Sequence, residues 1–162
     1  MAPIPTEKRP LHARFDSRQQ EAFLNLWRAY DRLRMLEDAL FAQFDLTAQQ
    51  YNALRILRSV YPQSMPTLLL GGKLVSRAPD ITRLIDKLVE RNWVERQRSA
   101  QSRRVIQVCI TESGIALLDT LAEKVQECHL KQLGHLRRSE LDALIDLLKK
   151  VRAPHEPDLN TW

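Results

Sequence analysis

The residues best suited to chemistry in this chain are four arginines within residues 96–104, a stretch that contains no acidic residue. The segment between them is polar except for Ala100. A guanidinium group matches phosphate oxygens in a planar, two-pronged geometry. Because no carboxylate lies within this segment to compete for them, these arginines indicate a surface that binds a polyanion.

The flanking residues predict that this basic stretch is the tip of a hairpin. Residues 93–96 form a short extended arm, and residues 104–110 alternate between apolar and polar. Three branched side chains share one face of the second arm: Ile106, Val108 and Ile110. Cys109 should therefore face the other way, as a half-exposed thiol. The nearby arginines could lower its pKa, although an incidental role is the simpler interpretation.

A helix is predicted immediately before the hairpin, over residues 76–92. Ser76 can cap its first turn, Pro79 suits that turn, and Asn92 tolerates the left-handed conformation of a helix exit. One face is apolar: Ile81, Leu84, Ile85 and Leu88. Charged residues lie off that face: Arg77, Asp80, Arg83 and Lys87. Such a helix can enter the major groove of duplex DNA, while the basic hairpin reaches the backbone or minor groove.

This part of the chain resembles the recognition helix and wing of the MarR family of transcriptional regulators. The matching segments are Ser76-Arg77, TRLIDKL at 82–88, VER at 94–96, Arg103-Arg104 and ITESG at 110–114. The family usually has Asp-Arg-Arg in the wing and a glycine before the first wing strand. Ser102 and Asn92 stand at those positions here. Because Ser102 has no charge to hold Arg104, a more mobile wing is expected.

The resemblance covers about residues 22–151 and implies a mainly α (α+β) fold, a winged helix-turn-helix with a two-stranded wing. The expected parts are a flexible arm at 1–15, a helical dimerisation region from 16–45 and 111–152, a DNA-binding domain at 46–110, and a tail at 153–162. The family implies a homodimeric repressor that binds a palindromic operator in double-stranded DNA and is released by a ligand or stress signal. The residues expected to contact DNA are Ser76, Arg77, Ala78, Pro79, Thr82, Arg83, Lys87, Arg98, Arg103 and Arg104.

Apolar spacing and end signals predict further helices on both sides of this region. Their expected ranges are 16–44, 47–62 with Thr47 and Gln50 as a capping box, 66–74, 111–133 and 139–151. The terminal helices carry more apolar surface than a small wing domain can cover. Pairing with a twin chain would bury that surface and give a two-fold dimer.

The helix at 16–44 carries Phe23, Trp27 and Tyr30 on one stripe. The resemblance implies a pocket for aromatic acids or phenols between the dimer helices and the DNA-binding lobe. Trp27 and Tyr30 are its candidate lining residues, and ordinary core packing is the alternative for each.

The composition indicates a folded protein with a hydrophobic core and a basic surface that favours anionic partners. The chain has 162 residues, 44% of them hydrophobic, and a net charge of +5. No apolar run reaches membrane-spanning length, and the N-terminus lacks the apolar core of a signal peptide. A cytoplasmic protein without a membrane partner is expected. Two cysteines do not make a disulfide framework.

Catalytic and metal-binding patterns find no support in the sequence. The motifs G-x-S-x-G, H-E-x-x-H and a complete phosphate loop are absent, so neither an enzyme nor a cofactor is expected. Cys128 and His129 are adjacent and point about 100° apart on a helix, which does not favour a metal site. One alternative from another class stays open: a winged-helix module whose basic surface binds an acidic protein partner.

Overall fold

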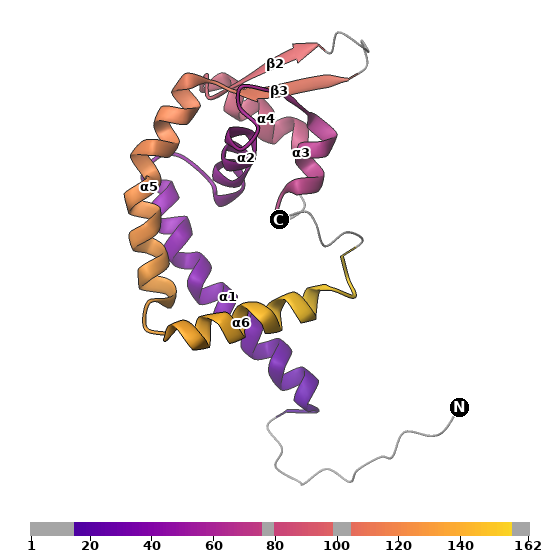
Figure 1. Ribbon diagram of the computed structural model, residues 1–162, viewed down its shortest axis with the longest axis vertical. Coiled ribbons are helices and arrows are strands. Elements are labelled where there is room, and N and C mark those ends of the chain that lie inside the picture. Colours follow the sequence, from indigo (N-terminus) through magenta and orange to yellow (C-terminus); the bar gives the residue numbers. More distant parts are fainter. Residues whose placement is uncertain (1–14, 76–79, 99–104, 157–162) are drawn as a thin grey trace, which may run out of the picture. The chain divides into compact units, whose positions relative to one another are not determined.

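Three short helices followed by a β-hairpin form the winged helix-turn-helix that the sequence predicts. The computed structural model (Figure 1) describes residues 15–75, 80–98 and 105–156, except for the side chain of Arg98. In chain order the elements are α1 (Arg18–Ala42), α2 (Ala48–Arg58), β1 (Met65–Pro66), α3 (Thr67–Lys73), α4 (Ile81–Glu90), β2 (Val94–Arg98), β3 (Ile106–Ile110), α5 (Glu112–Leu133) and α6 (Arg138–Arg152). The chain divides into two units, Met1–Met35 and Leu36–Trp162, so α1 crosses the boundary between them.

Helix α2 begins at the predicted capping box. The Thr47 hydroxyl accepts a hydrogen bond from the backbone N–H of Gln50 at 3.2 Å, and the Gln50 side chain accepts one from the Thr47 N–H at 2.9 Å. Two N–H groups that would otherwise lack partners are thus satisfied. The helix ends at Arg58, before Pro62, which cannot continue it.

The hydrophobic core lies in the second unit and joins all the elements of the winged helix-turn-helix. Its fully buried side chains include Leu54, Leu57, Leu70, Ile85, Leu88, Val108 and Leu121. Phe41, near the end of α1, stacks on Tyr51 of α2 with ring centroids 4.6 Å apart. These contacts fix the end of α1 to the winged helix-turn-helix.

Strands β2 and β3 form the expected two-stranded wing, and a third strand that was not predicted, β1, joins the same sheet. Its order is β1-β3-β2, all antiparallel, and β1 pairs with β3 through Met65 opposite Val108 and Pro66 opposite Gln107. A strand of two residues is too short to show alternation in sequence. Pro66 is tolerated in it because β1 is an edge strand.

Helix α4 begins later than expected. Asp80, not Ser76, is its N-cap, because the Asp80 side chain accepts a hydrogen bond from the N–H of Arg83 at 2.9 Å. Residues 76–79 lie outside the described residues. The exit agrees with the expectation, since Asn92 follows the helix with φ 57°.

The turn after α4 is also the place where α5 begins. Thr111 donates from its hydroxyl to the Asn92 carbonyl at 2.6 Å and from its backbone N–H to the Trp93 carbonyl at 3.0 Å. The same hydroxyl accepts from the N–H of Gly114 at 3.1 Å, which caps α5 as predicted. Thr111 therefore links the end of α4 to the start of α5.

The remaining helices agree with their predicted ranges within about two residues. Helix α5 ends at Leu133 with Gly134 as its C-cap, and α6 has no buried residue. Apolar side chains of α6 are exposed: Ile145, Leu147 and Val151. In the first unit, α1 exposes Phe23, Trp27 and Tyr30. Among the described helices, none combines the length and hydropathy required to span a bilayer.

Substitution of Gly114 tests the junction between α4 and α5. A Cβ at this position would lie 2.3 Å from the Trp93 carbonyl oxygen and 2.8 Å from an Ile110 side-chain carbon. Because the nearest atom belongs to the backbone, we expect Gly114→Ala to lower the free energy of unfolding by about 1–3 kcal/mol. Urea unfolding at a fixed protein concentration measures this change.

Gly72→Ala is the matched control, because a Cβ there would meet nothing within 4 Å. Alanine is about 1 kcal/mol more favourable than glycine inside a helix, so this variant should be neutral or more stable. Equal effects of the two substitutions would contradict the steric explanation.

Candidate nucleic-acid interface

Helix α4 presents a polar face because its other face is anchored in the core. Leu84, Ile85 and Leu88 are buried, whereas Thr82, Arg83 and Lys87 are exposed. Arg83 and Lys87 are four residues apart and therefore lie on the same side of the helix. The structure brings together these three members of the predicted contact set.

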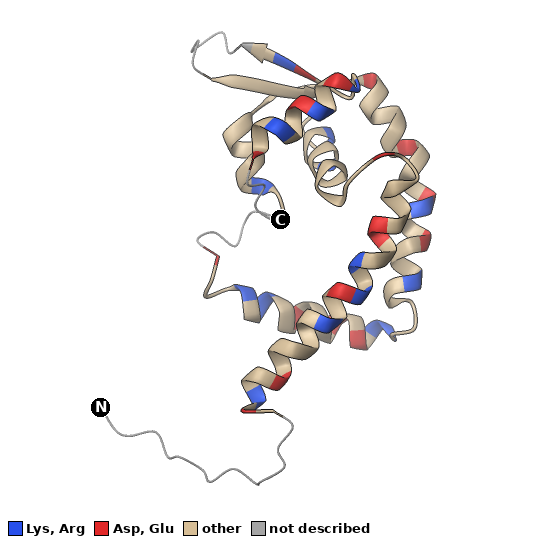
Figure 2. Cartoon of the chain, turned by 180° about the vertical axis from the view of Figure 1, so that it is seen from behind, with Lys and Arg blue, Asp and Glu red and all other residues tan. Residues whose placement is uncertain are grey.

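The acidic residues of α4 alternate with its basic ones, as the red and blue segments of Figure 2 show. One acid of the helix and the acid that caps it already have partners within the protein. Asp80 caps the helix, and Asp86 forms an ion pair with Arg96 of β2 at 2.5 Å. Both pairings reduce the negative charge that the helix presents to an approaching phosphate backbone.

The described part of the wing carries Arg96 and the backbone of Arg98. Arg98 pairs with Ile106 at the far end of the β2–β3 ladder, which places it toward the tip. Arg103, Arg104 and residues 76–79 lie outside the described residues, so their roles as DNA contacts stay predictions.

Sequence analysis missed the pairing of Asp86 with Arg96. Both residues belong to the motifs on which the resemblance rests, but they come from a helix and a strand. The periodicity of a helix or of a strand cannot predict a contact between a residue of one and a residue of the other. Only the packing of β2 beside α4 brings the two side chains together.

Both cysteines are buried, which corrects the expectation of a half-exposed Cys109. The missed strand β1 and the turn before it explain the difference, since the Cys109 thiol lies 3.7 Å from the Pro62 carbonyl and 3.6 Å from that of Gln63. Burial, aided by Glu95, raises the pKa of Cys109 instead of lowering it. Burial and Glu37 likewise raise the pKa of Cys128. Both thiols are therefore protonated at neutral pH and poorly reactive.

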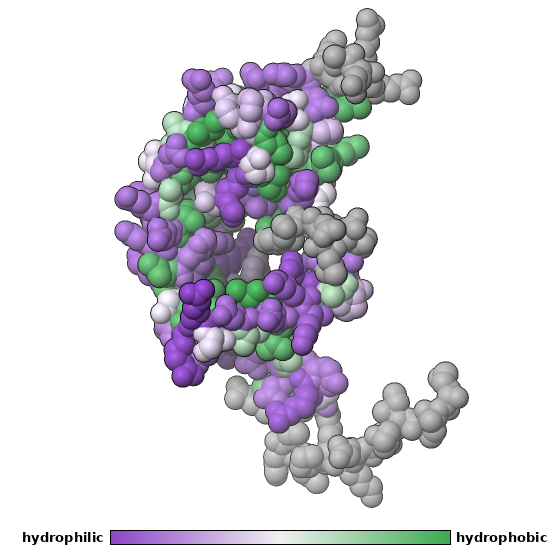
Figure 3. Space-filling view, in the orientation of Figure 1, coloured by the Kyte–Doolittle hydropathy of each residue, from purple (hydrophilic) through white to green (hydrophobic). Residues whose placement is uncertain are grey.

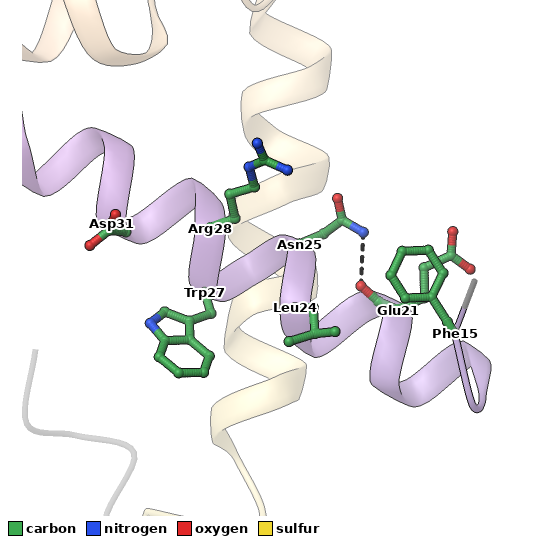
Figure 4. Close-up of a pocket in the computed structure, with 7 residues that line it drawn as sticks. All are labelled: Phe15, Glu21, Leu24, Asn25, Trp27, Arg28 and Asp31. Atoms are coloured by element: carbon green, nitrogen blue, oxygen red, sulfur yellow. Dashed lines mark hydrogen bonds between the residues drawn. The ribbon is translucent and has the colours of Figure 1, made fainter.

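The aromatic stripe of α1 borders an open hollow of about 750 Å³ (Figure 4). Trp27, Leu24 and Phe15 supply its apolar lining, while Tyr30 is not among the lining residues. Arg28 is its basic side chain, with Glu21 and Asp31 also on the lining. An anion there would meet two carboxylates as well as one guanidinium group.

A second cleft, of about 400 Å³, lies between α2 and α5 within the second unit. Tyr51, Arg55 and Arg58 line it together with Leu118 and Ala122. Burial raises the pKa of Tyr51, so its hydroxyl stays protonated at neutral pH and can donate a hydrogen bond. In the part of the chain that the structure describes, no group of three or more potential ligands is placed to hold a metal ion.

Comparisons with known proteins agree with this geometry. The sequence model of the MarR family matches residues 46–106. The HTH-type transcriptional regulator YpoP of Bacillus subtilis (strain 168), described as uncharacterized, is 34% identical over 107 residues, which cover 66% of this chain and 74% of that protein.

Solved structures extend the likeness over most of the chain. A MarR transcription factor from Planctomyces limnophilus is 53% identical, with 84% of this chain and 98% of that chain covered and a TM-score of 0.68. A mutant MarR from E. coli, complexed with operator DNA, is 26% identical, with 81% and 93% covered and a TM-score of 0.73. The arrangement of α2, α3, α4 and the wing and the extent of these matches lead to one conclusion: the chain belongs to the MarR family of transcriptional regulators, which bind DNA.

Proposed function

We propose that this protein is a sequence-specific repressor that binds a palindromic operator as a homodimer. The observation that carries the proposal is the exposed face of α4, where Thr82, Arg83 and Lys87 project beside the wing while the opposite face is buried. The likeness to an E. coli relative solved on operator DNA supports the same use of this surface.

Arg83 and Lys87 suit different parts of a DNA duplex. The planar guanidinium group of Arg83 can donate two hydrogen bonds to one guanine, which discriminates between bases. The ammonium group of Lys87 is a compact charge that suits phosphate. We therefore assign base reading to Arg83 and backbone attraction to Lys87, with Arg98 and the predicted wing arginines adding further phosphate contacts.

Exposed apolar surface supports the homodimer. Figure 3 shows hydrophobic residues exposed among hydrophilic ones on the visible face of the molecule. Trp27 is 61% exposed and Phe23 is 60% exposed in the first unit, and the two rings lie 6.0 Å apart. In the second unit, Leu147 of α6 is 60% exposed. Large aromatic and aliphatic side chains of this kind are stabilised by burial against another chain. A two-fold axis would then place two copies of α4 about 34–36 Å apart, one turn of B-DNA.

Occupation of an operator by such a dimer blocks access of other proteins to the same DNA, which favours repression. A regulator that binds chromosomal DNA in this way works in the cytoplasm. Enzymatic activity is not part of the proposal, because the family consists of transcriptional regulators. Selection of bound duplexes from random DNA tests the whole assignment, since a palindromic consensus with half-sites one turn apart is expected.

A small aromatic anion is the proposed releasing signal. The α2–α5 cleft suits it better than the hollow at Trp27, because Arg55 and Arg58 line the cleft, whereas two carboxylates line the hollow. Arg58 is already paired with Asp119 at 2.8 Å, which leaves Arg55 as the main anion contact. Release requires that the ligand bind the DNA-incompetent conformation more tightly than the DNA-bound one.

The base-reading role of Arg83 is tested by Arg83→Ala on the selected duplex and on random DNA. Loss of a bidentate guanine contact should weaken specific binding by about 1–3 kcal/mol and leave binding to random DNA nearly unchanged. Fluorescence anisotropy titrations give both affinities. Lys87→Ala is the comparison, and it should weaken both complexes alike. Equal losses from Arg83→Ala on both duplexes would reassign Arg83 to phosphate.

The dimer is tested by removing α6. A chain that ends before Arg137 loses the exposed apolar residues of α6, and we expect monomers or aggregates by light scattering. A chain that ends at Glu156 keeps α6 and loses only the tail, so it should remain dimeric. A stable dimer formed by the shorter chain would contradict a role for α6 in dimerisation.

Ligand release is tested by adding aromatic acids to the protein–DNA complex. An active compound should lower the affinity for DNA, and Arg55→Gln should weaken its effect if the α2–α5 cleft is its site. Trp27→Phe should leave the effect unchanged in that case and weaken it if the hollow on α1 is used instead. Release that is insensitive to both substitutions would place the ligand elsewhere.

A further inference from the structure

We propose that the ion pair between Asp86 and Arg96 is a positioning device that holds the wing at a fixed angle to the recognition helix and thereby sets sequence discrimination. The inference rests on the DNA-binding function proposed above. It assigns roles to two residues that are not themselves expected to contact DNA.

The guanidinium group of Arg96 bridges one full turn of α4. Its Nη2 lies 2.5 Å from the carboxylate of Asp86 and 3.4 Å from the carbonyl oxygen of Thr82. These two partners are four residues apart, so they lie on the same side of the helix. A single arginine of the strand is thus attached to α4 at two points.

The backbone of Arg96 in β2 is also held in place. In the β-ladder Arg96 is opposite Val108, which is fully buried at the centre of the sheet. The core therefore fixes the position of the β2 backbone at Arg96. The Arg96 side chain connects that backbone to α4. Because a charge-assisted hydrogen bond is directional, it can fix the rotation of the helix about its own axis. Contacts made by Leu84, Ile85 and Leu88 are non-directional and restrain this rotation less.

The position of this pair at the base of the wing matters because the sequence has an uncharged residue, Ser102, between the two wing strands. The pair can hold the wing through β2 without a charge at position 102. Both partners are partly exposed, with 33% of the Arg96 side chain and 45% of the Asp86 side chain accessible. Such pairs contribute little to folding, so the test must measure discrimination between DNA sequences rather than protein stability.

Two other roles for these residues give different results on DNA. If Arg96 binds phosphate, its removal weakens binding to every sequence alike and lowers the salt dependence by about 0.9 for each phosphate that is no longer neutralised. If Asp86 only repels phosphate, its neutralisation strengthens binding to every sequence alike. If the pair positions α4, removal of either partner lowers the ratio of specific to random affinity.

The experiment compares Asp86→Asn, Arg96→Gln and the double variant with the full-length wild-type chain. Affinities are measured on the selected duplex and on a random duplex at several salt concentrations. Each single variant should lower the ratio of the two affinities by about fivefold per subunit, the upper end for an exposed ion pair. The double variant should be no worse than either single one, because both remove the same interaction. The salt dependence on random DNA should not change.

Arg137 and Glu140 provide the matched control pair. They form a 2.8 Å ion pair of partly exposed side chains at the start of α6, outside the winged helix-turn-helix. Arg137→Gln and Glu140→Gln should leave the affinity ratio unchanged. Arg96→Lys keeps the charge without the guanidinium fork and should restore part of the discrimination.

Three results would overturn the positioning role: an unchanged ratio in both single variants, additive losses in the double variant, or an equal drop in the control pair. If the wild-type chain itself shows no preference between duplexes, the proposed repressor function fails together with this inference. A wild-type preference that survives in the variants rejects this inference alone.

Discussion

The amphipathic character of α4 is the constraint on which the rest of the structure depends. Within ten residues the helix must bury Leu84, Ile85 and Leu88 and still leave Arg83 and Lys87 exposed. Its exit is equally constrained, because Asn92 adopts φ 57° and its carbonyl accepts a hydrogen bond from Thr111 at the start of α5. Helix α4 is therefore connected to α5 through one tightly packed turn, with no space for a side chain at Gly114.

The net charge of +5 attracts DNA but does not explain how one DNA sequence is distinguished from another. Helix α4 itself carries charges of both signs, but Asp86 and the N-cap Asp80 have partners within the protein. Arg83 and Lys87 stay exposed on one side of the helix. Discrimination between sequences then depends on geometry, because attraction to phosphate is the same for every sequence.

The proposed regulation and assembly would use surfaces outside α4. The exposed aromatic stripe of α1 and the exposed leucine and isoleucine of α6 are unfavourable in water, and a second chain would remove that cost. The cleft between α2 and α5 adjoins the helix that starts at Thr111. A ligand in this cleft would therefore act on the same helix that is bonded to the exit of α4, which gives it a short physical route to the DNA-binding surface.

The sequence by itself determined the features that are local. Helical spacing, the capping box at Thr47, the left-handed exit at Asn92 and the cap at Thr111 each depend on residues a few positions apart. Tertiary structure alone decided the strand β1, the burial of Cys109 beneath the Pro62 turn, and the pairing of Asp86 with Arg96. The use of Asp80 rather than Ser76 as the cap of α4 was also decided there, since both residue types can cap a helix. The physical reason is that residues distant in sequence come into contact only when the core has fixed how helices and strands pack. The periodicity of apolar residues does not predict such contacts.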